Sequence, residues 1–157
     1  MGKVLSTFTH GFPGAIARSL DDVVVAHPNR GAEPLPFGYP VVMNSQGTGV
    51  VPFDPESHTA AQFVGVTVRT PSKTPDAYGE NEASYAVNEL ADIMVRGHIA
   101  VRFSGNAKVG DAVAALSDGE FGAASGGDGV TLTNAHVSAV PDGKGMAEIV
   151  LNTRNLV

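Results

Sequence analysis

The side chains that could do chemistry in this chain are scattered rather than grouped. The chain has five histidines, namely His10, His27, His58, His98 and His136. No two of them have the HxH or HxxxH spacing that places two imidazoles side by side on a strand or a helix to hold a metal ion. Cysteine is absent, which excludes disulfides, thiolate metal ligands and cysteine nucleophiles. We therefore predict no metal site and no cofactor.

Three short sequences resemble catalytic or ion-binding motifs, and each lacks an essential part. Ser125 follows Gly122 at the wrong spacing for the G-x-S-x-G turn of a hydrolase. Lys144 lies between two glycines but has neither the upstream glycine nor the following Ser or Thr of a phosphate-binding loop. Residues 126–129 (GGDG) lack the alternating acids and closing Glu of a calcium loop, so a hairpin turn explains them better. We expect no catalytic residues and predict that the protein is not an enzyme.

The element that must organise the chain is the segment 91–103 (ADIMVRGHIAVRF). Its odd positions are apolar or glycine, and its even positions are mostly polar. This period of two places the two sets on opposite faces of a β-strand. The segment is longer than an ordinary strand of roughly 5–6 residues. Gly97 at its midpoint therefore predicts a bulge or corner, where one strand bends and enters two regions of sheet.

The remaining strands are short and separated by turn signals. We predict strands at 41–43, 63–68, 112–116, 130–132, 136–140 and 146–151, with 47–51 extended and a long polar loop at 69–89. Turns that recur about every ten residues are typical of a barrel or a sandwich. The predicted fold is all-β: a single small β-barrel or sandwich domain with an extended N-terminal arm and little helix.

Residues 1–39 are expected to form the arm, and residues 40–157 the β domain of one folding unit. Prolines and glycines interrupt every long periodic run in the arm, although 21–27 (DDVVVAH) has the composition of a short strand. Apolar residues recur every four positions at Phe8, Phe12, Ile16 and Leu20, so a short helix is an alternative for this stretch. An apolar arm without its own core must pack on something, either its own domain or a neighbouring subunit.

Charge and hydropathy exclude two classes of partner. The net charge is −6 and no cluster of Lys or Arg exists to displace counterions from nucleic acid. No run approaches the ~20 apolar residues of a membrane span. The first six residues match the pattern for N-myristoylation, but that pattern is short and common by chance. We predict a soluble protein that contacts neither nucleic acid nor membrane.

Three groups of apolar and glycine-containing stretches stand out along the chain. They are 12–17 followed by 34–42, 63–67 followed by 97–101, and 108–113 with 147–151. In this order they resemble the structural cement, or head decoration, proteins of tailed bacteriophages, over roughly residues 12–151. The loop 69–89 is particular to this sequence and takes no part in the resemblance.

The resemblance implies a mechanical function. Such proteins bind the outer surface of the phage head, bridge neighbouring major capsid subunits and stabilise the shell, after synthesis in the host cytoplasm. It also implies a homo-oligomer, with a trimer preferred and a dimer as the rival. The aromatic and apolar residues expected at the interface are Phe8, Phe12, Ile16, Phe37 and Tyr39 in the arm, and Tyr78 and Tyr85 in the loop.

One alternative of another class stays open. A small β-barrel could be a binding module, for carbohydrate or another ligand, in a phage tail fibre or adhesin. Sugar rings stack on exposed aromatic platforms, and this chain has no Trp and three Tyr with which to build one.

Overall fold

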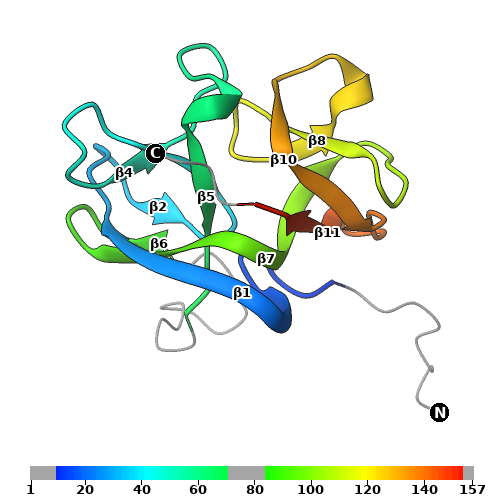
Figure 1. Cartoon of the computed structure of the whole chain (residues 1–157), viewed down its shortest axis with the longest axis horizontal. Coiled ribbons are helices and arrows are strands. Elements are labelled where there is room, and N and C mark those ends of the chain that lie inside the picture. Colours follow the sequence, from blue (N-terminus) through cyan, green and yellow to red (C-terminus); the bar gives the residue numbers. More distant parts are fainter. Residues whose placement is uncertain (1–9, 71–83, 154–157) are drawn as a thin grey trace.

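The computed structural model of the protein describes residues 10–70 and 84–153 (Figure 1). Within these ranges the chain forms a nine-stranded sheet, a separate two-stranded sheet and two short 3-10 turns. The strands are β1 (Ile16–Pro28), β2 (Leu35–Pro36), β3 (Pro40–Met43), β4 (Val50–Pro52), β5 (Phe63–Thr67), β6 (Ser84–Tyr85), β7 (Leu90–Ser104), β8 (Ala112–Ala115), β9 (Phe121–Ala123), β10 (Val130–Ala139) and β11 (Met146–Leu151). The 3-10 turns are η1 (Ala60–Gln62) and η2 (Ala124–Gly126). The all-β prediction is confirmed.

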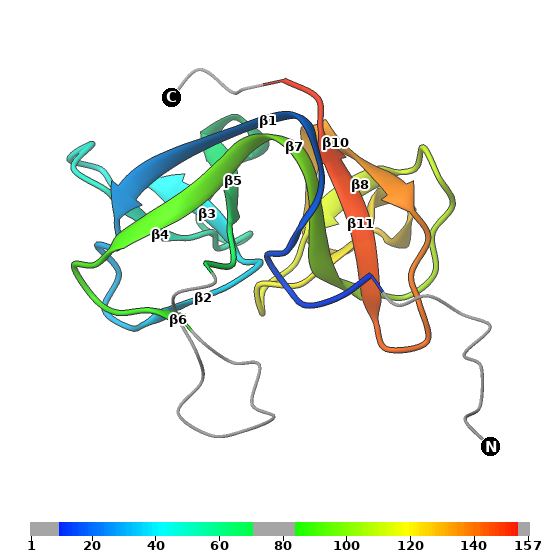
Figure 2. The same ribbon diagram turned by 90° about the horizontal axis from the view of Figure 1, so that it is seen from below.

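The long central strand is confirmed as β7, and it enters two regions of sheet. Its first half pairs with β5 on one side and β1 on the other, whereas its second half pairs with β11 and, at its end, with β9. Figure 2 shows β7 curving from one region into the other. The strands β7, β9, β8, β10 and β11 close into a five-stranded barrel, because β11 pairs with both β10 and β7.

Gly97 marks the change of direction in β7. Its φ of +127° is a backbone conformation that residues with a Cβ rarely adopt. A Cβ on Gly97 would also lie 2.9 Å from the Cβ of Asp22, which β1 places against it. Val95, before the glycine, belongs to the core under β1, β3 and β6, while Ile99, two residues after it, belongs to the barrel core. One alternating strand therefore supplies two hydrophobic cores.

Several details of the chain differ from the predictions. The two strands predicted at 130–132 and 136–140 are one strand, β10, which ends at Ala139 and whose pairing with β8 is irregular between Thr131 and His136. The short β9 was missed, because its three residues with a central glycine carry no readable periodicity. In the arm, residues 16–28 form β1, an edge strand paired with β7, and the helix alternative is wrong for this stretch.

The side-by-side packing of β5 and β7 leads to a first prediction. A Cβ on Gly65 would lie 2.1 Å from the main-chain oxygen of Met94, which cannot move without breaking the sheet. We expect Gly65→Ala to lower the free energy of unfolding by about 1–3 kcal/mol or more, as overpacked cores do. The measurement is thermal and urea denaturation followed by circular dichroism. Gly126→Ala is the matched control, since nothing lies within 4 Å of a Cβ built there. Equal stability of the two variants would contradict the packing.

Candidate functional site

The N-terminal segment His10–Arg18 is held by main-chain hydrogen bonds to both regions of sheet. The Gly14 N–H donates to the oxygen of Ala100 in β7 (2.8 Å), and the Ala100 N–H donates to the oxygen of Ala15 (2.9 Å). On the other side, the Arg69 N–H donates to the oxygen of Gly14 (2.7 Å). Figure 2 shows this segment passing between the barrel and the sheet region that contains β5. Its main chain is therefore fixed over this short stretch.

Two glycines allow this close approach. Gly14 and Gly38 have φ values of +78° and +75°. A Cβ on Gly14 would lie 2.8 Å from the main-chain oxygen of Thr67, and a Cβ on Gly38 would lie 2.8 Å from the Cβ of Pro13. Backbone packs directly on backbone here, so both positions require glycine.

A stack of aromatic and cationic groups supports the side chain of Phe12. The guanidinium carbon of Arg69 lies 4.9 Å from the centre of the Phe12 ring and 5.5 Å from that of Phe37. Phe37 in turn packs edge-on against Tyr85, with 5.3 Å between ring centres. The Tyr85 hydroxyl donates to the oxygen of Val68 (2.6 Å), and burial raises the pKa of this hydroxyl. The stack positions Phe12, whose side chain remains 47% exposed.

Beside this segment lies a groove of about 600 Å³. We call it the N-terminal groove, and it is lined by Gly11, Phe12, Pro13, Arg102, Phe103, Glu120, Lys144, Gly145 and Met146. Its lining combines apolar side chains with two cations and one carboxylate. Such a mixture suits an apolar protein segment that carries an acidic side chain.

His10 anchors the outer end of the segment to the turn between β10 and β11. The His10 N–H donates to Asp142 Oδ2 (3.1 Å), and its Nε2 lies 2.7 Å from the oxygen of Val140. Partial burial opposes ionisation of Asp142, but hydrogen bonds from the N–H groups of Met146, His10 and Lys144 outweigh it and lower the pKa of this carboxyl.

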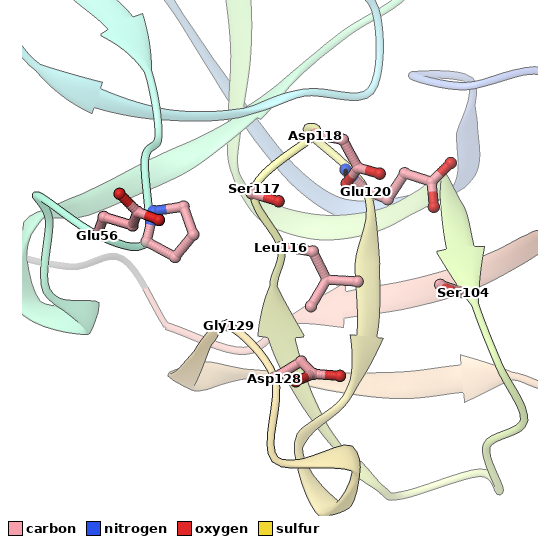
Figure 3. Close-up of a pocket in the computed structure, with 9 residues that line it drawn as sticks. Glu56, Ser104, Leu116, Ser117, Asp118, Glu120, Asp128 and Gly129 are labelled. Carbon is pink, nitrogen blue, oxygen red and sulfur yellow. Dashed lines mark hydrogen bonds between the residues drawn. The ribbon is translucent and has the colours of Figure 1, made fainter.

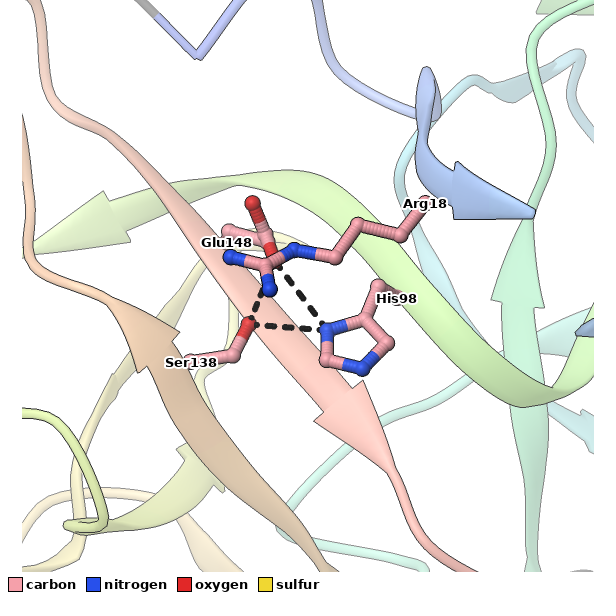
Figure 4. A network of polar contacts seen from close by, with 4 residues as sticks. All are labelled: Arg18, His98, Ser138 and Glu148. Atoms are coloured by element: carbon pink, nitrogen blue, oxygen red, sulfur yellow. Dashed lines mark hydrogen bonds and ion pairs between the residues drawn. The ribbon is translucent and has the colours of Figure 1, made fainter. Parts of the chain in front are cut away.

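A second polar cluster ties β1 to the barrel (Figure 4). Glu148 Oε1 accepts hydrogen bonds from Arg18 Nε (3.0 Å) and Ser138 Oγ (2.9 Å), and it lies 3.1 Å from Nδ1 of His98. These four residues come from four different strands, β1, β10, β11 and β7. Their spacing in the sequence therefore could not predict that they meet. His98 is half-buried, and its Nδ1 lies within hydrogen-bonding distance of both Ser138 and Glu148.

The same cluster contains the residue types of a hydrolase triad in a different arrangement. In a triad, the acid and the nucleophile contact opposite nitrogens of the imidazole. Here Ser138 Oγ (3.2 Å) and Glu148 Oε1 both lie against Nδ1 of His98, and the serine donates its proton to the glutamate. This geometry gives no path for a proton from Ser138 through the ring, and the cluster is a structural tie.

An acidic hollow of about 470 Å³ lies on the barrel side of the molecule (Figure 3). Glu56, Asp118, Glu120 and Asp128 surround it, with the side chain of Leu116 between them. In the part of the chain that the structure describes, no three His, Asp or Glu side chains are grouped closely enough to hold a metal ion. Carboxylates dispersed in this way are solvated surface groups.

The residues predicted at the interface occupy different environments. Phe12 and Ile16 are exposed on the N-terminal segment, and Ile16 pairs with Ile99 of β7. Tyr39 is half-buried over Gly119, and its hydroxyl donates to the oxygen of Asp118 (2.7 Å).

Of the other four predicted residues, two are buried and two lie outside the described part of the chain. Phe37 and Tyr85 are buried in the core at 5% and 1% exposure. Phe8 and Tyr78 lie outside the described residues. The structure thus brings Phe12, Phe37 and Tyr85 into one stack, through an arginine that sequence reasoning did not single out.

The tie between β1 and the barrel leads to a second prediction. Glu148→Ala removes the carboxylate that accepts from Arg18 and Ser138 and lies against His98. Because it leaves partly buried polar groups unpaired, we expect a loss of about 1–3 kcal/mol in the free energy of unfolding. Arg18→Ala is the control, because the Arg18 side chain is 59% exposed and such ion pairs contribute at most ~1 kcal/mol. Urea denaturation measures both. A larger effect of Arg18→Ala would contradict the assignment.

The anchor at Asp142 leads to a third prediction. Since its folded-state pKa lies below the ordinary 3.8, its carboxylate stabilises the fold above that pH, and the contribution is lost as pH falls through the lowered value. We expect Asp142→Asn to be less stable than the parent at neutral pH, with the difference shrinking in acid. Asp128→Asn is the matched control, because Asp128 is an exposed acid without a hydrogen bond among the described residues. Denaturation midpoints across a pH series test this, and a difference that grows in acid would refute it.

Comparison with known proteins relates this architecture to phage heads. A chain in the solved structure of the capsid of Myoviridae phage XM1 has the same fold, with a TM-score of 0.74, 16% sequence identity and coverage of 95% of this chain and 94% of that one. No curated protein sequence matches. The model of the family described as structural cement protein (E217 gp24/Pam3 gp6) matches residues 3–152. This match spans nearly the whole chain and agrees with the resemblance of its short motifs, and the chain therefore belongs to the phage structural cement protein family.

Proposed function

We propose that this protein binds the outer surface of a phage head, where it bridges neighbouring major capsid subunits and reinforces the shell. Membership of the cement family makes it a structural component of the virion that associates with capsid proteins. Placement on the outer surface, the bridging of subunits and the absence of enzymatic activity are parts of the proposal.

The proposal rests on how the N-terminal segment is held and which of its side chains are exposed. Its main chain is pinned to both regions of sheet, while the side chains of Phe12 and Ile16 point outwards at 47% and 40% exposure. Apolar groups held in this way lose little conformational freedom when a partner covers them, which favours binding. The N-terminal groove beside Phe12 adds further apolar and charged residues to the same surface.

The division between arm and β domain is part of this proposal. Residues 16–28 belong to the sheet as β1, so the part of the arm outside the sheet precedes Ile16, whose own side chain stays exposed at the start of β1. We propose Phe12 and Ile16 as direct contacts, together with Phe8 from the undescribed residues. Phe37 and Tyr85 would act from beneath, by holding Arg69 and through it Phe12.

Repetition strengthens a modest contact on a shell. Interfaces near the low end of ~1,200 Å² are weak alone. Many copies on a closed lattice, each touching two subunits, raise the cost of separating any pair. A homo-oligomer would add to this effect, and Tyr39, Tyr78 and the loop 69–89 remain candidate contacts for it.

A carbohydrate-binding role has less support. Among the aromatic residues within 10–70 and 84–153, Phe12 alone is largely exposed. A single ring beside a cation does not make the platform on which sugars stack.

The test is co-sedimentation with heads that lack this protein. We expect the double variant Phe12→Ala with Ile16→Ala to fold normally and to bind heads at least about tenfold more weakly, as loss of two anchoring side chains does. Val109→Ala is the matched control, because Val109 is an apolar residue of 66% exposure outside the N-terminal segment. Heads that bind the double variant at full occupancy would overturn the assignment of this surface.

A further inference from the structure

The N-terminal groove is lined by residues from four parts of the chain. They are the N-terminal segment, the end of β7, the connection from β10 to β11, and Glu120 just before β9. Hydrogen bonds join these parts to one another. The Phe103 N–H donates to the oxygen of Gly145 (2.8 Å), and His10 links the N-terminal segment to the turn between β10 and β11. The groove is therefore preformed, and a partner that fills it has few protein groups to order.

The turn that carries Lys144 is held in one conformation. Asp142 Oδ1 accepts hydrogen bonds from the N–H groups of Lys144 (2.8 Å) and Met146 (3.0 Å), and the Gly145 N–H donates to the Asp142 main-chain oxygen (3.2 Å). The Lys144 side chain is exposed, and within residues 10–70 and 84–153 it has no hydrogen-bond or ion-pair partner. Its ammonium group is thus carried on a fixed main chain and is available to another molecule.

The groove has a local charge opposite to that of the whole chain. The chain has 16 acidic and 10 basic residues, and its net charge is −6. Among the described residues that line the groove, Arg102 and Lys144 are basic and Glu120 alone is acidic. The lining also includes two phenylalanines and a methionine, which, like arginine, are enriched at protein interfaces. An apolar surface with excess positive charge is complementary to a carboxylate on an apolar segment.

We propose that the N-terminal groove binds a segment of the major capsid protein that presents an apolar side chain to Phe12 and an Asp or Glu carboxylate to Lys144. This inference rests on the proposed function and names the chemistry of the partner. Arg102 adds a second positive charge, whereas Glu120 repels a carboxylate placed close to it. The three charges therefore favour some positions of the acidic segment over others.

Other occupants fit these charges less well. Residues 1–9 (MGKVLSTFT), which precede His10, contain one lysine and no acid, so they would add positive charge to the groove. A second copy of the chain has the same net charge of −6, which opposes association of the two. Nucleic acid requires a broad basic surface, and two cations beside Glu120 do not supply one.

The experiment is co-sedimentation with heads that lack this protein, over a series of protein concentrations. We expect Lys144→Glu to bind about tenfold more weakly, because it sets a carboxylate against the carboxylate of the partner. Lys144→Gln should weaken binding less, and Lys144→Arg should bind like the parent. Lys108→Glu is the matched control, because Lys108 is an exposed lysine outside the groove and the change in charge is the same.

Glu120 gives an expectation of the opposite sign. Glu120→Gln removes the acid that repels the partner, so it should bind heads more tightly than the parent. Glu56→Gln removes the same charge from an exposed acid outside the groove and should leave binding unchanged. Added salt should weaken binding of the parent more than that of Lys144→Gln, since salt screens the pair of charges. Circular dichroism and the melting temperature establish that all variants are folded.

The outcomes separate this inference from the proposed function. If heads release the Phe12→Ala with Ile16→Ala variant but bind Lys144→Glu like the parent, the groove assignment is overturned and the proposed function stands. A parent that does not bind heads overturns both. Equal weakening by Lys144→Glu and Lys108→Glu would also overturn the groove assignment. So would a Lys144→Glu variant that binds heads normally but loses self-association in size-exclusion chromatography with light scattering, because the groove would then hold a second copy.

Discussion

The structure depends on one strand being shared by two hydrophobic cores. β7 contributes Val95 to one core and Ile99 to the other, and between them the chain turns at Gly97 with φ +127°. Neither half has a complete sheet without its part of β7. We therefore expect the barrel and the β3–β5 region to unfold together, since a break at β7 exposes both cores at once. In the proposed role of reinforcing a shell, such coupling means that neither half of the protein unfolds before the other.

The N-terminal segment uses the same strand as its support. It binds Ala100 of β7 on one side and Arg69 on the other, while His10 reaches the β10–β11 turn. Glu148 then fixes Arg18 to the barrel next to His98. The segment is thus attached by main-chain bonds at its centre and by charged side chains at its ends. In the described part of the chain no helix is both long and apolar enough to cross a bilayer.

Sequence reasoning predicted β7, its turn at Gly97 and most of the barrel strands, because an alternating pattern and a glycine are local signals. It could not place Arg69 between Phe12 and Phe37, since a cation between two rings from distant segments has no periodicity. Tyr85 illustrates the same limit, because an aromatic residue in a polar loop is expected at the surface. In the structure it pairs with Leu35 across β2 and β6, donates to the Val68 oxygen and is buried in the core. The cluster around Glu148 could not be predicted from the sequence either, because its residues come from four different strands. Phe12 and Ile16 were predicted as contacts and lie exposed, and whether they meet a partner is a question for binding experiments.

The glycine pair Gly14 and Gly38 has a consequence for how such a protein can diverge. The segment is joined to the body there by backbone atoms, with Thr67 and Pro13 in contact with the missing Cβ positions. Contacts of this kind are indifferent to the identity of the neighbouring side chains. Mutations at Phe12 or Ile16 can therefore accumulate without releasing the segment, provided that the two glycines persist. If the segment contacts the shell as proposed, its exposed side chains can change one at a time to suit a different shell while the main-chain attachment stays the same.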